Sequence, residues 1–413
     1  MTTAVTAKFG AMSDTGMVQE AVFGQPLSAK TYFPMTGNGM NIDPGLFSPK
    51  LMFGHRDANS FALNGQFKNA GTLAGPVWPT NAASLIPGAI GPDAQPGYGV
   101  TGTAGTGSTT LSASSAANAT SVTVTSATGF TVGQIVQIDI NNTATPTTAE
   151  CRKISAIVSN TLTLDVALTY AHASGVALIG VQAPGTGLFA HSIQQAVALS
   201  SYTIEKNLGG PASLGGQSIL FAGSRVNKLS INVTATDAEA ALSADMVAQS
   251  AAVLDSPTNP VVINEMPYVF SEGTLSLFGQ TVAQASGFTM DIDNKLISTY
   301  TFNGSHNLQF LTPGMLEVMG KIDLVWQSFD DSTWGYWTQA LNGGHGVLSF
   351  TLAHPTTGGS VSFSCPNVYI KTDVEDPKPE DIVMESLNYL AFLNLATNNT
   401  ISATITDSSY LPL

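Results

Sequence analysis

Alternating apolar and polar residues fill several short runs between residues 201 and 294, and this period of two constrains the fold most. Successive side chains of a β-strand point to opposite faces, so the pattern is typical of half-buried strands. In the run RVNKLSINV the alternation predicts one face made of Val226, Lys228, Ser230 and Asn232. No cluster of catalytic residue types interrupts these runs, so they favour an assembling part over an enzyme.

The composition of the chain is poor in charge. The 413 residues are enough for two or three domains with a sizeable core. Charged residues make up 10% of the chain, against about 25% in a typical soluble domain. Such a surface suits either a secreted β protein or a subunit that is covered by copies of itself. The net charge of −14 argues against tight nucleic-acid binding, which needs Lys and Arg to displace counterions.

The two cysteines, Cys151 and Cys365, belong to no CxxC or Cys/His pattern, so the sequence predicts no zinc site. Cys365 lies in a strand-like run and is expected to pack as a small buried hydrophobe. A disulfide between the two has no feature in its favour. The N-terminal residues lack the apolar core of a secretory signal, and no apolar run is long enough to cross a membrane. We therefore expect a soluble chain, cytoplasmic when synthesised, with no membrane partner.

Shifts in composition divide the chain into four parts. Residues 1–97 are rich in Gly, Pro and Asn and predict an N-terminal arm and the first part of a larger domain. A Gly/Thr/Ser linker covers 98–110, and a small all-β domain is inserted at 111–182. The larger domain resumes over 183–413.

Local signals place short elements in these parts. In the first part we expect strands at Thr31–Phe33 and Leu51–Gly54, and a brief helix at Asn81–Ile86 between Pro79 and Pro87. The inserted domain is expected to hold strands at 121–126, 135–140, 150–158, 161–168 and 175–181.

One helix is expected within residues 330–344 of the larger domain. Asp331 or Ser332 can cap its N-terminus, and Gly343 can take the left-handed conformation after its last turn. Its aromatic stripe is expected to pack on a sheet through Trp334, Trp337 and Leu341.

No catalytic, cofactor-binding or metal-binding residues are predicted. The six histidines are scattered without HExxH spacing, so they are interpreted as loop residues. Asp291 and Asp293 alternate with apolar residues and share one face of a strand, where two carboxylates suit a cation or acid–base work. A solvated strand face is the favoured interpretation, and a carboxylate row that lines a channel is the third.

Five motifs in order give the second half a resemblance to a known family. They are YTIEKNLGG, FAGSRVNKLSINV, GFTMDIDNKL, LTPGMLEVMGKIDLVW and CPNVYIK. Over 189–413, and more loosely over 17–97, the chain resembles the tail tube (major tail) proteins of long flexible-tailed bacteriophages. The inserted unit is similar to small β modules found on many phage structural proteins.

The resemblance implies a mainly β fold, a β-sandwich with one flanking helix, and a structural role in the virion tail. It implies hexameric rings whose inner sheets join into a β-barrel, and which stack into a tube that DNA passes through. Tail terminator, tape measure and baseplate proteins are the implied partners, and the host bacterial cytoplasm is the implied place of assembly. Within this resemblance, we hypothesise that acids on alternating strands face the lumen, namely Asp291, Asp293, Glu317 and Asp323.

Other classes of protein are weighed against this interpretation. A major capsid protein typically carries a long spine helix, and no amphipathic run of that length is visible. A secreted carbohydrate-binding or surface-layer β protein would need a signal and calcium loops, which the sequence lacks. A hydrolase with paired carboxylates is the weakest alternative.

Overall fold

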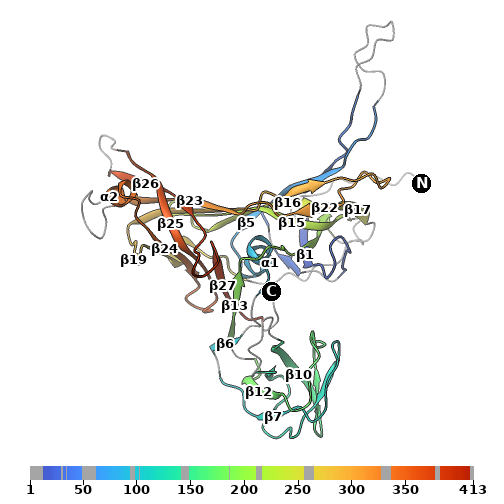
Figure 1. Ribbon diagram of the computed structural model, residues 1–413. Helices are drawn as coiled ribbons and strands as arrows, with labels where there is room; N and C mark the ends of the chain where they lie inside the picture. Colours follow the sequence, from blue (N-terminus) through green and yellow to red (C-terminus); the bar gives the residue numbers. More distant parts are fainter. Residues whose placement is uncertain are drawn as a thin grey trace. The chain divides into compact units, whose positions relative to one another are not determined.

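The computed structural model describes residues 13–28, 31–33, 35–48, 62–93, 98–101, 103–140, 148–185, 187–210, 216–254, 265–326, 336–376 and 382–409. Over these residues the chain is mainly β, as predicted, with two α-helices (Figure 1). It divides into two compact units. The first comprises Met1–Pro92, Gln195–Leu352 and Phe363–Ile401, and the second comprises Asp93–Gln194, Ala353–Ser362 and Ser402–Leu413.

The first unit contains both helices and most of the strands. Its helices are α1 (Pro79–Ile90) and α2 (Tyr336–Leu341), and Phe270–Glu272 forms a 3₁₀ turn. Its strands, with β25 continuing into it from the second unit, are β1 (Asp14–Gln19), β2 (Thr31–Phe33), β3 (Gly37–Asn38), β4 (Asn41–Asp43), β5 (Lys68–Pro76), β14 (Tyr202–Leu208), β15 (Gln217–Thr234), β16 (Ala241–Ala248), β17 (Ser250–Leu254), β18 (Gly273–Leu277), β19 (Gln280–Thr281), β20 (Ala285–Asp293), β21 (Ile297–Thr299), β22 (Phe310–Thr312), β23 (Glu317–Val325), β24 (His345–Ala353), β25 (Ser360–Asp376) and β26 (Met384–Ala391). The predicted strand at Leu51–Gly54 lies outside the described residues.

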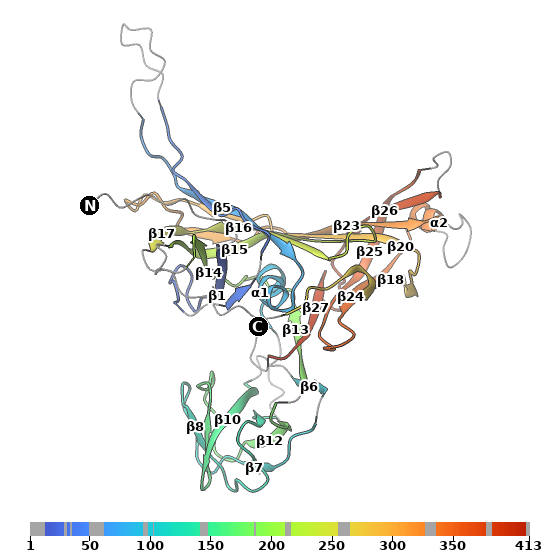
Figure 2. The same cartoon turned by 180° about the vertical axis from the view of Figure 1, so that it is seen from behind.

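Strand β15, which is 18 residues long, joins two antiparallel arrays of the first unit. Its first half pairs with β14 and β17, and β14 continues to β1 and β2. Its second half lies between β16 and β20. From there pairing continues outward to β5 on one side, and through β23 and β26 to β25 on the other (Figure 2). We call the array β5–β16–β15–β20–β23–β26–β25 the long sheet.

One face of the long sheet is buried and forms a sandwich core. Its buried side chains include Leu73, Leu229, Ile231, Met290, Ile292, Val318, Ile322, Leu387 and Tyr389. The paired strands β18 and β24 cover part of this face, where Phe350 stacks on Phe288 with ring centroids 4.2 Å apart. Burial of each large apolar side chain contributes about 1.5–3 kcal/mol, so this face holds the unit together. In Figures 1 and 2, α1 and β24 lie on the same side of the long sheet.

Helix α1 extends beyond its predicted ends in both directions. Pro79 stands at the first helical position, where its fixed φ is suitable and its missing N–H is not needed. The Asn81 side chain accepts a hydrogen bond from the N–H of Trp78 (2.9 Å), which holds the start. The helix continues through Pro87 to Ile90 because its last residues are buried against the sheet. Reading Pro79 and Pro87 as flanks of the helix was therefore wrong.

The alternation in β15 breaks at one residue. Lys228, Ser230 and Asn232 lie together on the outward face, as predicted. Val226 is fully buried instead, because the register with β16 shifts between Val226 and Lys228. The extra residue at this bulge turns Val226 inward. There it lies close to Gly88 of α1, so the bulge is the place where helix and sheet meet.

Helix α2 is short, and its packing differs from the predicted stripe. Trp334 and the side chain of Trp337 lie outside the described residues, and so do both candidate N-caps. The Leu341 side chain is 70% exposed in the single chain. The expectation that it packs on the sheet of its own chain is therefore wrong. Tyr336, which the sequence did not single out, is buried with its ring 6.5 Å from Phe278. Gly343 has φ +68° and takes the left-handed position that was predicted.

The second unit contains a small barrel and an antiparallel array built around β13. Its strands are β6 (Tyr98–Thr101), β7 (Ser108–Thr110), β8 (Ser121–Thr123), β9 (Ile135–Ile138), β10 (Glu150–Val158), β11 (Thr161–Leu164), β12 (Ala177–Gln182), β13 (Leu188–Gln194) and β27 (Ser402–Asp407). Six pair in the order β7–β12–β9–β10–β11–β8, and the bridge between Leu111 and Val124 brings β8 back to β7. Closure removes the exposed edges that a small open sheet would have. Strand β13 pairs with both β6 and β27.

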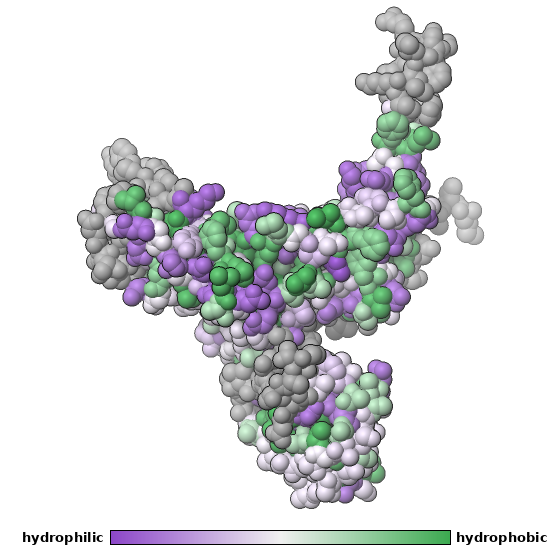
Figure 3. Space-filling view, viewed as in Figure 1, coloured by the Kyte–Doolittle hydropathy of each residue, from purple (hydrophilic) through white to green (hydrophobic). Residues whose placement is uncertain are grey.

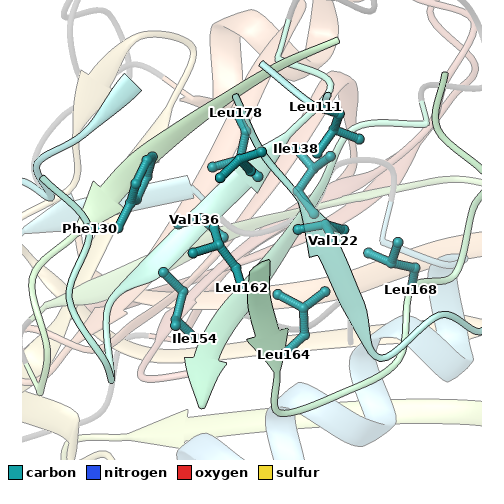
Figure 4. Close-up of a cluster of buried hydrophobic side chains, with 11 residues drawn as sticks. Leu111, Val122, Phe130, Val136, Ile138, Ile154, Leu162, Leu164, Leu168 and Leu178 are labelled. Carbon is teal, nitrogen blue, oxygen red and sulfur yellow. The ribbon is translucent and has the colours of Figure 1, made fainter. Parts of the chain in front are cut away.

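The barrel is filled by apolar side chains and solvated by small polar ones. Figure 4 shows the side chains of its core, which include Phe130, Val136, Ile154 and Leu162. On the visible face in Figure 3 this barrel is mostly white to pale purple, as hydroxyl-rich and Gly-rich surfaces are. Residues 98–110 resemble a linker in composition, yet they include β6 and β7. Threonine suits both roles, because it is polar and also β-branched.

A buried ionic network lies in the second unit. Arg152, Glu150 and His172 are each at most 3% exposed. Arg152 forms an ion pair with Glu150, and His172 Nε2 lies 2.7 Å from Glu150 Oε1. Burial would raise the pKa of Glu150, but hydrogen bonds from His172 and two backbone N–H groups, with the Arg152 charge, hold it below its ordinary value. His172 lies between β11 and β12, outside the named strands as a loop histidine would, but its side chain is buried in this network.

His191 is a second buried histidine that the sequence analysis missed. It is fully buried on β13, with Nδ1 2.7 Å from Asp93 Oδ2. Its Nε2 lies 3.0 Å from the Ser409 carbonyl and 3.4 Å from Asp407 Oδ1. Burial opposes the charged form, but hydrogen bonds to Asp407 and Asp93 outweigh it and raise the pKa of His191 to about 9. In its charged form, His191 of β13 therefore contacts both Asp93 and the end of β27.

This raised pKa predicts that the second unit loses stability in alkali. A histidine with a raised folded-state pKa contributes fully below its unfolded pKa of about 6.5 and loses the contribution as pH rises toward about 9. We expect the free energy of unfolding to fall by at most about 3 kcal/mol over that window. Urea unfolding between pH 6 and 9.5 measures it. The free energy of unfolding of His191→Gln should depend less on pH. His345→Gln changes an exposed histidine and should show the same pH dependence as the wild type. A wild-type curve as flat as that of His191→Gln contradicts the assignment.

Candidate functional site on the long sheet

The outward face of the long sheet is polar and carries most of the candidate residues. Because side chains alternate along each strand, these residues point away from the buried face. We call this set the polar face: Thr72 on β5, Ser243 and Asp245 on β16, Lys228, Ser230 and Asn232 on β15, Thr289, Asp291 and Asp293 on β20, Glu317, Met319, Lys321 and Asp323 on β23, Ser386 and Asn388 on β26, and Lys295 in the turn after β20.

All four predicted acids lie on the polar face, and each is half-buried. Asp293 stands directly opposite Glu317, and Asp291 stands opposite Met319. Asp323 lies further along β23, opposite Gly287. The structure therefore brings Asp291, Asp293 and Glu317 to neighbouring positions and places Asp323 apart from them on the same face.

Three lysines, which the sequence analysis did not assign, pair with three of these acids. Lys228 Nζ lies 3.0 Å from Asp291 Oδ2, and Lys321 Nζ lies 2.7 Å from Asp323 Oδ1. Lys295 forms an ion pair with Glu317, and that hydrogen bond raises the pKa of Lys295 above its ordinary value. The i, i+2 spacing of Lys321 and Asp323 was a usable signal, since it places both on one face. The other two pairs depend on how strands and turns meet.

Hydroxyl groups from neighbouring strands hold three carboxylates in place. Ser230 Oγ donates to Asp291 Oδ1 (2.5 Å), and Ser386 Oγ donates to Asp323 Oδ1 (2.6 Å). At the other end of the face, Thr72 Oγ1 donates to Asp245 Oδ1 (2.5 Å). Among the described residues, Asp245 and Asp293 are the two carboxylates of the polar face that form no ion pair. The polar face therefore carries five carboxylates, three of them held by hydroxyl groups, and three lysines that are each paired with a carboxylate.

The described residues hold no group of three His, Cys, Asp or Glu side chains placed to bind a metal ion. The arrangement is a sheet surface lined by ion pairs and hydroxyl groups.

The fold and this site define a mainly β protein whose long sheet is apolar on one face and lined with paired charges on the other. A scan against protein-family models matches residues 90–391 to the family described as phage tail tube protein. The match covers more than half of the chain, and the chain belongs to the phage tail tube protein family. It is a structural protein of the virion tail, where members of this family assemble into a tube with other tail proteins.

A search of curated proteins finds no match. Neither helix of the described residues is long and apolar enough to cross a membrane.

Proposed function

We propose that this chain is a non-enzymatic subunit of hexameric rings that stack into the tail tube, with the polar face of the long sheet lining the lumen through which DNA reaches the host. The one-sided burial of the long sheet carries the proposal. Helix α1 and strand β24 pack on the apolar face, while the other face presents fixed carboxylates. In this account, the subunits assemble in the host bacterial cytoplasm and meet tail terminator, tape measure and baseplate proteins.

The edge of the long sheet beyond β5 is blunted by short strands, which is compatible with a specific ring contact but not with random pairing. Beyond β5 the long sheet ends in β3 and β4, which are two and three residues long. Short edge strands discourage random pairing, and joining neighbouring subunits in a ring removes edges altogether. A head-to-tail contact that does not close along the axis then yields a filament rather than a single ring.

The charge of the polar face fits the passage of DNA without adhesion. Binding to a duplex depends on Lys and Arg that displace counterions from phosphates. The lysines of the polar face are paired with carboxylates, and the whole chain carries −14. A lumen of this kind repels phosphate and offers few free cations.

Cysteine labelling tests where the polar face lies in an assembled tube. Asn232 is exposed on this face, so Asn232→Cys should react in the unassembled chain with both a small maleimide and a bulky polyethylene glycol maleimide. In tubes, a lumen position should still react with the small reagent and lose reaction with the bulky one. The native background is low, because Cys151 and Cys365 are buried and burial raises the pKa of each thiol to about 12.

The other outcomes of the labelling contradict the proposal in different ways. Reaction with both reagents in tubes would place Asn232 on the outer wall. Reaction with neither would place it in a contact between subunits. Electron micrographs of the same samples report whether tubes form at all, and their absence at high protein concentration counts against the stacked rings.

A further inference from the structure

Two of the three ion pairs of the polar face, Lys228–Asp291 and Lys321–Asp323, have a carboxylate that also accepts a hydrogen bond from a serine. Asp291 uses one oxygen for Lys228 (3.0 Å) and the other for the Ser230 hydroxyl (2.5 Å). Asp323 receives both Lys321 (2.7 Å) and the Ser386 hydroxyl (2.6 Å) on Oδ1. Each carboxylate is thus oriented by a neighbouring strand before its lysine reaches it, which reduces the entropy lost when the pair forms.

The paired lysines remain accessible enough to meet a ligand. The side chains of Lys228 and Lys321 are 36% and 43% exposed, and their partner carboxylates are about one third exposed. Exposed ion pairs contribute only about 0–1 kcal/mol to stability. Their stability alone therefore does not explain why lysines stand on a surface past which DNA is proposed to move.

We propose that Asp291 and Asp323 act as restraints that hold Lys228 and Lys321 away from phosphate, so that the polar face carries lysines without gripping DNA. This inference rests on the proposed function and refines it, because net repulsion alone assigns the same role to every acid of the face. Here the acids that matter are those that pair with a lysine and also accept a serine hydrogen bond, Asp291 and Asp323. A phosphate that approaches Lys228 has to displace a carboxylate already oriented by Ser230.

Two double variants with the same change in charge separate restraint from repulsion. Asp291→Asn/Asp323→Asn removes the negative charge that pairs with each lysine and changes the net charge by +2, from −14 to −12. Asp245→Asn/Asp293→Asn makes the same change on the same face at acids that form no ion pair among the described residues. The two double variants are closely matched, because in both of them asparagine can still accept hydrogen bonds that the aspartates accept. These come from Ser386 Oγ in the first variant, and from Thr72 Oγ1 and the Lys295 N–H in the second.

The readout is retention of the unassembled chain on immobilised double-stranded DNA at low ionic strength. We expect the wild type and Asp245→Asn/Asp293→Asn to flow through. Asp291→Asn/Asp323→Asn should be retained and elute with added salt on the order of 0.1 M, because phosphate contacts are strongly salt-dependent. Adding Lys228→Gln and Lys321→Gln to the retained variant should abolish its retention.

Two outcomes overturn the inference. Equal retention of the two charge-matched variants would mean that net charge alone governs adhesion. Flow-through of Asp291→Asn/Asp323→Asn would mean that the released lysines do not bind phosphate. Circular dichroism confirms that each variant is folded. Since the column uses the unassembled chain, a failure to form tubes counts against the stacked rings and leaves the DNA result intact.

Discussion

Replacement of Gly320 by alanine is expected to prevent the long sheet from forming, with a loss of stability of about 3 kcal/mol or more. Gly320 lies on β23 directly opposite Tyr389 of β26. A Cβ atom at this position would overlap the carbonyl oxygen of Thr289 on β20 and stand 2.5 Å from the Tyr389 hydroxyl. The carbonyl belongs to the backbone of the adjacent strand, so it has no means of moving away without breaking the sheet.

The missing side chain of Gly320 makes room for a buried tyrosine. The Tyr389 hydroxyl donates to the Thr289 carbonyl (2.9 Å) across the glycine, and its ring lies 6.3 Å from that of Phe288. Tyr389→Phe should therefore lose only about 1 kcal/mol, the contribution of one hydrogen bond. A steric effect of this kind predicts a much larger loss for Gly320→Ala.

Urea unfolding and the yield of soluble protein measure the effect of Gly320→Ala. Gly37→Ala is the matched control, since a Cβ at Gly37 on β3 meets nothing within 4 Å. If Gly320→Ala unfolds at the same urea concentration as Gly37→Ala, the close approach of β20 and β23 at this point is not as described.

Replacement of Glu20 by alanine is the second change with a large expected effect. Glu20 is only 7% exposed, and its carboxylate accepts four hydrogen bonds. Oε1 accepts from Thr203 Oγ1 (2.9 Å) and the Gly223 N–H (2.8 Å), while Oε2 accepts from Ser201 Oγ (2.9 Å) and the Gly24 N–H (2.8 Å). Without the carboxylate, the buried N–H of Gly223 and the part-buried N–H of Gly24 lose their partner, and we expect a loss of roughly 3 kcal/mol or more.

A graded series distinguishes lost hydrogen bonds from lost volume. Glu20→Gln keeps the shape and one acceptor oxygen but turns an amide N–H toward two donors, so its loss should fall between those of the wild type and Glu20→Ala. Urea unfolding of the three proteins at one pH gives the order. Equal stability of Glu20→Gln and Glu20→Ala would mean that the site requires the negative charge rather than its acceptors.

Features that depend on short-range periodicity were predictable. The strands at Thr31–Phe33 and 150–158 coincide with β2 and β10, and Asp291 and Asp293 share the outward face of β20. Each follows from alternation within a few residues and from local turn signals. The same reasoning placed Lys228 with Ser230 and Asn232.

Features that depend on contacts between distant segments were not predictable. Val226 turns inward because of a shift in register against β16, and α1 passes through Pro87 because its end is buried. The contacts of His191 join residues on three separate segments, so no short sequence pattern predicts them. The pairing of Lys228 with Asp291 likewise depends on how β15 meets β20, which a single strand does not encode.

The central claim is that the polar face of the long sheet lines the lumen of a tube. A helical reconstruction of tubes assembled from this chain, at a resolution that traces β20 and β23, tests it most directly. We expect rings of six subunits with Asp291, Glu317 and Asp323 on the inner wall. Tubes in which these residues lie on the outer wall or in contacts between subunits would contradict it.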